Sequence, residues 1–376
     1  MKHFPGFGPA LFGDSMIDQN ERLSNEIHGK RVGVKTIRRR AMIIVTIGIV
    51  AIVTLYIFSL TVGAYHISYS EAFDQMVIIL QTWGHPTDMS GKIIYNLRMP
   101  RSIAVLLVGA GLSIAGAVMQ ALIHNPLVDP YVTGVSSGAS FGVVLMTLGG
   151  MISVGSIATM WLIPVGAILG AVGAFLLTMT VAEAAGGKAM SYVLGGTVMA
   201  AGLSAGTTLI MYFNSDKIQH ITSWMFGSFA GIDWQDVYII TIPIVLIIAF
   251  VIYQARNLNV MLLGETQAQY LGMNSRTYKR NMLILVAVLT AFCVAYCGVI
   301  GFLGLIVPHL CRMVVGGDHR VLLPTSVVCG SIVLLVADII CRSNLQGELP
   351  IGAIISVVGV PFFIYLMVKE GKKYAM

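Results

Sequence analysis

The sequence has very little charge for its length. Of its 376 residues, 11% are Asp, Glu, Lys or Arg and 56% are hydrophobic, whereas about a quarter of a typical soluble domain is charged. A chain of this composition cannot cover a folded surface with polar groups. Most of its surface must therefore face lipid, which excludes a soluble domain carrying a single anchor.

Several chemical signatures are also missing. There is no H-E-x-x-H zinc motif, and Gly186-Gly187-Lys188 lacks the earlier glycine and the following Ser or Thr of an ATP-binding loop. The two acids noted in the apolar runs, Glu183 and Asp338, stand near the ends of those runs. These absences disfavour a membrane enzyme and an ion-coupled carrier, which usually keeps ionisable groups at mid-depth. We expect no cofactor and no metal site. Asp338 precedes Arg342 by one helical turn, which predicts a local ion pair.

Apolar runs of membrane length are abundant. A span needs roughly 20 mostly apolar residues, and such runs recur from Ala41 to the carboxyl end. We predict an all-α polytopic membrane protein with about ten transmembrane helices in one domain, residues 41–376, after a polar, basic, weakly ordered tail, residues 1–40. The expected spans are Ala41–Val62, Ser102–Ile123, Ser137–Leu148, Ile157–Ala182, Met190–Tyr212, Val237–Tyr253, Met282–Ile300, Phe302–Val314, Leu322–Ile340 and Ile351–Val368. The third and eighth are too short to cross alone and are expected as partial spans.

The basic residues predict an orientation. With the amino terminus inside, alternating loops place 18 of the 23 Lys and Arg residues on the cytoplasmic side, as the positive-inside rule requires. Both termini are then cytoplasmic. Topology thus accounts for the net charge of +6, and no basic–aromatic interleaving indicates nucleic-acid binding.

Small residues mark two spans. In the second span, Gly109, Ser113 and Ala117 follow one another at intervals of four, which predicts a helix packed closely inside the bundle. The fifth span has the same character, and either close packing or lining of a wide conduit for a large solute would explain it. Its small residues include Gly195, Gly196, Ala200, Gly202 and Gly206.

The loop between the sixth and seventh spans predicts a short amphipathic helix. A negative charge at Glu265 suits the start of a helix, and Gly272 suits its end. Ala268, Leu271 and the pair 262–263 (both Leu) give it an apolar side. Such a helix could be a lever gripped by a partner outside the membrane, or it could lie on lipid headgroups.

From about Arg98 to the carboxyl end, the chain resembles the permease subunits of type II ABC importers, the FecCD family, which move iron–siderophores, haem and cobalamin. It is particularly similar to the cobalamin permeases of that family. The stretches that carry the resemblance are Arg98-Met-Pro-Arg101, Asn125-Pro-Leu127, Trp224–Trp234, Leu263-Gly-Glu265, Gly301–His309, Asp318-His-Arg320 and Glu348-Leu-Pro350.

The resemblance implies a machine with several subunits in the cell membrane. Two permease subunits, expected as a homodimer, would surround a path above two ATP-binding cassette ATPase subunits, and an extracytoplasmic substrate-binding protein would deliver the cargo. The chain itself would hydrolyse no ATP. An iron chelate is the preferred cargo, with cobalamin or haem as alternatives.

The resemblance also assigns residues to these contacts. Arg98 and Arg342 would pair with acids of the binding protein, and a short outer helix would lie within residues 216–236. The fifth span would line the path, and Lys188, Ala189 and Met190 would form its cytoplasmic gate. The segment that contacts the ATPase would comprise Gly264, Glu265, Ala268, Leu271 and Gly272.

Overall fold

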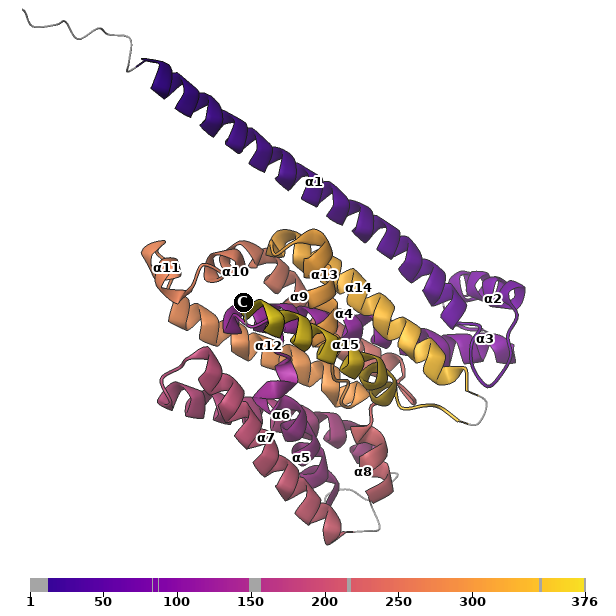
Figure 1. The fold of residues 1–376 in the computed structure, drawn as a ribbon. Helices are drawn as coiled ribbons and strands as arrows, with labels where there is room; N and C mark the ends of the chain where they lie inside the picture. Colours follow the sequence, from indigo (N-terminus) through magenta and orange to yellow (C-terminus); the bar gives the residue numbers. More distant parts are fainter. Residues whose placement is uncertain are drawn as a thin grey trace, which may run out of the picture.

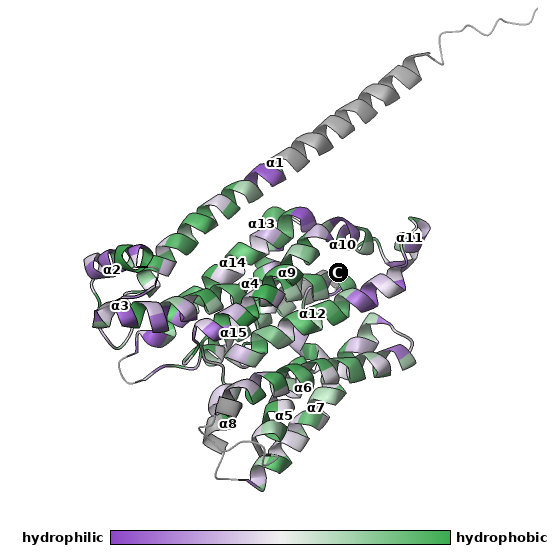
Figure 2. Ribbon diagram, turned by 180° about the vertical axis from the view of Figure 1, so that it is seen from behind, coloured by the Kyte–Doolittle hydropathy of each residue, from purple (hydrophilic) through white to green (hydrophobic). Residues whose placement is uncertain are grey.

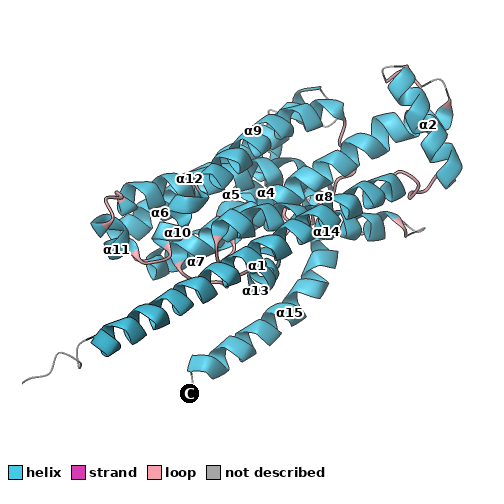
Figure 3. Cartoon of the chain, turned by 90° about the horizontal axis from the view of Figure 1, so that it is seen from above, coloured by secondary structure: helices cyan, strands magenta, loops and turns pink. Residues whose placement is uncertain are grey.

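The computed structural model describes residues 13–82, 84–86, 88–148, 157–214, 218–344 and 347–374, and these ranges form helices and loops without a strand (Figure 3). Residues 1–12 of the expected tail and Lys217 lie outside them. The helices, labelled as in Figure 1, are α1 Gly13–Ser59, α2 Tyr69–Gln81, α3 Met89–Ile93, η1 Ile94–Arg98, α4 Met99–Ile123, η2 Pro130–Thr133, α5 Val135–Leu148, α6 Ile157–Ala184, α7 Ala189–Tyr212, α8 Ile218–Met225, α9 Trp234–Tyr253, α10 Ala255–Met261, α11 Glu265–Tyr270, α12 Ser275–Cys297, α13 Leu303–Val315, α14 His319–Arg342 and α15 Ile351–Tyr374.

Each of the ten predicted spans coincides with a helix. In the described ranges, seven helices are long and apolar enough to cross a membrane, and three shorter apolar helices accompany them: Val135–Thr147, Leu303–Val315 and Ile351–Tyr365. The all-α membrane fold is therefore confirmed, including the shortness of the third and eighth spans. The short helix expected by resemblance before the sixth span is α8.

The first helix is longer than predicted. We expected a weakly ordered tail up to residue 40, but α1 begins at Gly13 and runs without a break for 47 residues. Its apolar part, Thr36–Ser59, is the expected span. Residues 13–40 contain no proline, and extending an existing helix costs far less than starting one. The polar segment therefore continues the span as a helix.

Helix α4 lies at the centre of the bundle, among α9, α12, α13 and α14 (Figure 1). A Cβ atom at Gly109 would lie 2.5 Å from the Gly330 carbonyl oxygen, and one at Gly116 would lie 1.7 Å from that of Gly304. Ser113 touches the same Gly330. These contacts confirm the predicted small-residue face, since any larger side chain would separate α4 from α13 and α14.

Helices α5, α6 and α7 form a second group along one side of the bundle (Figure 1). Gly138 faces Gly170 and Gly142 faces Gly166, so close that a Cβ atom on any of the four would overlap the facing helix. Helices α5 and α6 therefore pack through backbone contacts.

The two ends of the bundle differ. One end, here called the α2 end, carries α2, α3 and α8, and the opposite α11 end carries α10 and α11 (Figures 1 and 3). Sequence reasoning missed α2, which is too short for a span. Ser68 caps it by accepting a hydrogen bond from the Glu71 amide, and its Ile79 is buried with Leu60 and Ile94. Figure 2 shows that α2 and α3 mix polar and apolar residues, unlike the apolar stretches of α9 and α14.

Candidate functional site

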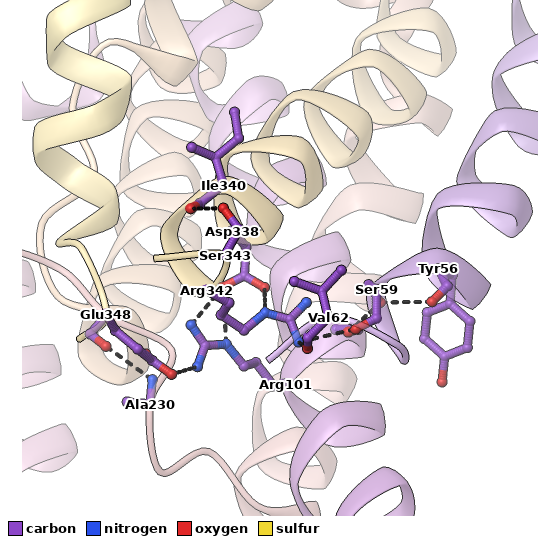
Figure 4. A network of polar contacts seen from close by, with 12 residues as sticks. Tyr56, Ser59, Val62, Arg101, Ala230, Asp338, Ile340, Arg342, Ser343 and Glu348 are labelled. Carbon is purple, nitrogen blue, oxygen red and sulfur yellow. Dashed lines mark hydrogen bonds and ion pairs between the residues drawn. The ribbon is translucent and has the colours of Figure 1, made fainter. Parts of the chain in front are cut away.

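A cluster of buried, charged side chains lies at the α2 end. Arg101 donates from Nε and Nη2 to Asp338 Oδ1, at 3.0 and 2.9 Å, and from Nη1 to Glu348 Oε1 at 2.7 Å. Arg342 Nε lies 2.9 Å from Asp338 Oδ2, which confirms the predicted ion pair (Figure 4). The Asp338 side chain is 1% exposed. One carboxylate therefore holds two guanidinium groups in a region shielded from water.

Arg98 and Arg342 both hold the end of α1. Arg98 donates to the carbonyl oxygens of Leu60 and Tyr65, and Arg342 Nη1 donates to that of Ser59 at 3.2 Å. Cations suit the carboxyl end of a helix because its last carbonyls have no partner within the helix. Both arginines are buried, at 5% and 7% exposed. They nevertheless line one hollow of about 310 Å³ at this end, together with Arg101 and Glu348.

The predicted path residues of α7 divide into two sets. A Cβ atom at Gly196 would lie 2.1 Å from the Val132 carbonyl oxygen, so this glycine packs against η2, and its neighbour Gly195 is buried too. Gly206 faces Phe141 of α5, and Ala200 is half-buried. Gly202, by contrast, is exposed with no atom near its missing side chain. Close packing thus holds for the face that carries Gly196, and the lining of a path by the exposed face stays a prediction.

A hollow rich in hydroxyl groups lies beside this exposed face. It measures about 430 Å³, and α5, α7 and α8 contribute seven Ser or Thr side chains to it but no charged residue. Ser204 Oγ lies 3.3 Å from Ser137 Oγ, joining α7 to α5. Thr207 and Thr208 each donate to the carbonyl oxygen one turn back, so their lone pairs remain as acceptors. The full lining is Ser136, Ser137, Ser140, Ser204, Thr207, Thr208, Met211, Thr222, Met225 and Val299.

At the α11 end, α11 presents an apolar tip. Leu263, Tyr270 and Leu271 are exposed by 57%, 86% and 65%, and Leu262 beside them is also exposed. Gly264 and Gly272 flank the helix at positive φ, and Gly272 ends it as predicted, with the Met273 amide bonding back to the Ala268 carbonyl. The predicted apolar side is correct except at Ala268, which is fully buried beneath the tip.

Two networks anchor this tip. Glu265 forms a 2.7 Å ion pair with Lys279 of α12. In α10, Asn259 donates to Asp318 Oδ1 at 2.6 Å and accepts from the backbone amide of His319, which ties α10 to the start of α14. Hydrogen bonds from Arg320 lower the pKa of Asp318 to about 2. The Asp318-His-Arg320 motif is thereby explained as an anchor for α10.

The predicted gate residues form the start of α7. Lys188 is its N-cap residue, Ala189 its first residue, and Met190 is 73% exposed. Before them, Gly186 and Gly187 turn the chain at φ values of +96° and +65°. Tyr192 donates to Glu183 Oε1 at 2.6 Å across this turn.

Sequence reasoning did not predict the surroundings of three buried, charged side chains. Arg101 and Lys279 acquire their partners only through folding; Arg101 and Asp338 are 237 positions apart. Asp129 also went unnoticed. It lies in the link between α4 and α5, 7% exposed, and its Oδ1 accepts from the Tyr131 amide while its Oδ2 has no hydrogen-bond partner among the described residues. The signal for Asp129 was its place between Pro126 and Pro130, inside a break of the apolar run.

Known proteins share this architecture. The chain is 34% identical over 340 residues to the iron(3+)-hydroxamate import system permease protein FhuG of Bacillus subtilis, a match covering 89% of the chain and 99% of the relative. It is 38% identical over 279 residues to the vitamin B12 import system permease protein BtuC of Photorhabdus laumondii, covering 73% and 82%. A solved structure described as a metal-chelate type ABC transporter, inward-facing, superposes with a TM-score of 0.75 at 29% identity, covering 87% of the chain and 99% of that structure.

The family comparison covers almost the whole membrane domain. The model of the FecCD transport family matches residues 34–369, from the apolar part of α1 to the last span. That range contains the arginine cluster, the α7 face and the α11 tip. The chain therefore belongs to the FecCD transport family.

Proposed function

We propose that the chain is the permease subunit of an ATP-driven importer whose energy comes from separate ATPase subunits. The observation that carries this proposal is the α11 tip. Leu262, Leu263, Tyr270 and Leu271 expose apolar side chains on a short helix that buried contacts hold in place. Exposed apolar and aromatic side chains on a rigid support are typical of a protein interface. The tip would fit a groove of the ATPase, with Gly264, Glu265, Ala268 and Gly272 supporting it.

The charge distribution supports an orientation. The positive-inside bias favours a cytoplasmic α11 end, where ATP is available, and an α2 end outside. Both termini would then be cytoplasmic. A second copy of the chain would face the exposed side of α7, with the path between the two copies, and Lys188, Ala189 and Met190 would close that path on the cytoplasmic side.

The arginine cluster would attract a substrate-binding protein. Three arginines and two acids leave one positive charge in excess at the α2 end. Arg98 and Arg342 lie at the wall of a hollow, so a carboxylate of the partner would reach them by entering it. An Arg98→Gln variant keeps a polar side chain with a hydrogen-bond donor but loses the charge. We expect it to weaken stimulation of ATP turnover by the binding protein and to leave basal turnover intact; unchanged stimulation would contradict docking at Arg98.

The hydroxyl-rich hollow favours an uncharged, oxygen-rich iron chelate as cargo. A ferric ion bound by three hydroxamates carries no net charge, and hydroxyl groups can exchange hydrogen bonds with its polar edge. Haem carries carboxylates, which would need a cation that the lining of this hollow lacks. Cobalamin remains the alternative within the same machine. Titrating the partner binding protein with a ferric trihydroxamate, cobalamin and haem would identify the cargo.

The proposal is tested by rebuilding the machine in liposomes with and without the ATPase subunit. We expect cargo uptake to require the ATPase and ATP, and to persist when ion gradients are collapsed. The rival is an ion-coupled carrier, for which Asp129 is the one buried carboxyl at a helix break among the described residues. Uptake without the ATPase that stops when the gradient collapses would overturn the proposal in favour of that rival.

A further inference from the structure

Lys279 is a buried lysine that joins three separate elements. It is 4% exposed and stands one turn into α12. Its ammonium group donates to Glu265 Oε1 of α11 at 2.7 Å and to the Gly187 carbonyl oxygen of the α6–α7 turn at 3.3 Å. It also lies 5.1 Å from the centre of the Tyr192 ring of α7, a cation–π contact.

The neighbouring charges differ from Lys279 in burial. Arg276, one turn earlier in α12, donates to Glu183 Oε2 at 2.7 Å, but its side chain is 77% exposed. Arg280, the next residue after Lys279, is exposed as well. Water screens exposed pairs and leaves them weak, whereas removing the partner of a buried charge is costly. The Lys279 side chain is 5% exposed, although Glu265 on the other side of the contact is 43% exposed. Lys279 is therefore the firm connection in this group.

The position of Lys279 matters because of what lies on each side of it. On one side is Glu265, the first residue of the helix whose apolar tip is the proposed ATPase contact. On the other side is the turn that leads directly into Lys188 and the exposed Met190. That turn contains two glycines at positive φ, a backbone that can change direction with little strain.

We infer that Lys279 is a positioning residue that makes the α6–α7 turn follow α11 when the ATPase moves it. This inference rests on the proposed function. With three donors on a compact head, the ammonium group holds the α11 carboxylate and the turn carbonyl at once, so α11 cannot shift without pulling on the turn. The pair Glu265–Lys279 thus converts movement at the tip into movement at the start of α7.

The test compares Lys279→Met with Arg280→Met, which removes the same charge from an adjacent, exposed position. Nitroxide labels at Thr266 of α11 and Ala185 of the turn, both exposed, report the distance between the two elements in the complete complex with the ATPase. When ATP is added, we expect one narrow distance distribution in the parent protein and in Arg280→Met. In Lys279→Met we expect a broad or shifted distribution, and at least a tenfold fall in cargo moved per ATP hydrolysed, measured with a ferric trihydroxamate.

The outcomes separate the two proposals. If the ATPase does not co-purify with the parent protein, the proposed function fails and this inference fails with it. If the ATPase binds but Lys279→Met keeps the parent distance distribution, the positioning role alone is overturned. A purely structural lysine would lower yield and ATP turnover together without changing transport per ATP. Should Lys279→Met fail to accumulate, Glu265→Gln weakens the same contact from its half-exposed side, and the same outcomes decide.

Discussion

The two ends of the bundle use their charges in opposite ways. At the α2 end, Arg101, Asp338 and Arg342 are all at most 10% exposed, and both arginines bind the aspartate. At the α11 end, most charges are exposed, Lys279 is buried against a half-exposed Glu265, and the exposed apolar side chains include leucines and a tyrosine. The first arrangement fixes the ends of three spans together. The second exposes an apolar surface that we propose binds another protein, and the Glu265–Lys279 pair ties this surface to α12.

The largest effect on folding is expected at the α2 end. Asp338→Asn would leave the guanidinium groups of Arg101 and Arg342 buried without their carboxylate. We expect a loss of about 3–5 kcal/mol of stability, seen as a lower unfolding midpoint and less monodisperse protein in detergent. Glu348→Gln is the control, because its side chain is 44% exposed and should cost at most about 1 kcal/mol. Equal losses in both variants would mean that burial does not distinguish these carboxylates.

The next effect concerns binding at the α11 end. Leu271 is 65% exposed, so Leu271→Asp should change the free energy of unfolding by about 0.5 kcal/mol or less. Association with the ATPase should weaken at least tenfold, about 1.4 kcal/mol, measured by titrating labelled ATPase onto the permease in nanodiscs. Leu349→Asp, a partly exposed leucine in the α14–α15 link, is the matched control and should keep normal association. Equal weakening in both variants would remove the special role of the tip.

The sequence predicted most of the fold because span length is a property of local composition. Ten apolar runs became ten helices, and Gly109 and Ser113 lie in a close helix contact as expected. Local composition gives a weaker signal for α2, which is short and mixes polar with apolar residues. It also gives no boundary for the start of α1, because the helix of the span continues into polar sequence.

The contacts of the candidate site were harder to predict. The pair Asp338–Arg342 is local and was predicted, but Arg101 reaches Asp338 only through the packing of α4 on α14. Small residues posed a similar difficulty. Gly196 and Gly202 look alike in sequence, yet one is pressed against η2 and the other faces open space. Which face of a helix meets a neighbour is decided by the assembled bundle.

A smaller effect is expected for the exposed ion pair near Lys279. Arg276→Gln removes an ion-pair partner of Glu183. The Arg276 side chain is 77% exposed. Such pairs are worth about 0–1 kcal/mol and weaken with salt. We expect a small shift of the unfolding midpoint that vanishes in high salt. A shift as large as that of Asp338→Asn would show that the α11 end is held as firmly as the α2 end.

The last predicted effect is a change in relative stability that occurs only as the solution becomes acidic. Hydrogen bonds from Arg320 lower the pKa of Asp318 to about 2, below the usual value of about 3.9. Because the folded pKa is the lower one, this carboxylate contributes its full stability above the unfolded value, and the contribution is lost as pH falls toward 2.

Asp318→Asn keeps a side-chain acceptor for the start of α14 but has no charge to lose. The difference in unfolding midpoint between parent and variant should therefore be constant from about pH 8 to 5 and shrink between about pH 4 and 2, since all other carboxylates are common to both proteins. A difference that stays constant down to pH 2 would mean that Arg320, which is 55% exposed, does not stabilise the ionised carboxylate. The hydrogen bonds of Asn259 to Asp318 and His319 would then tie α10 to α14 without help from that charge.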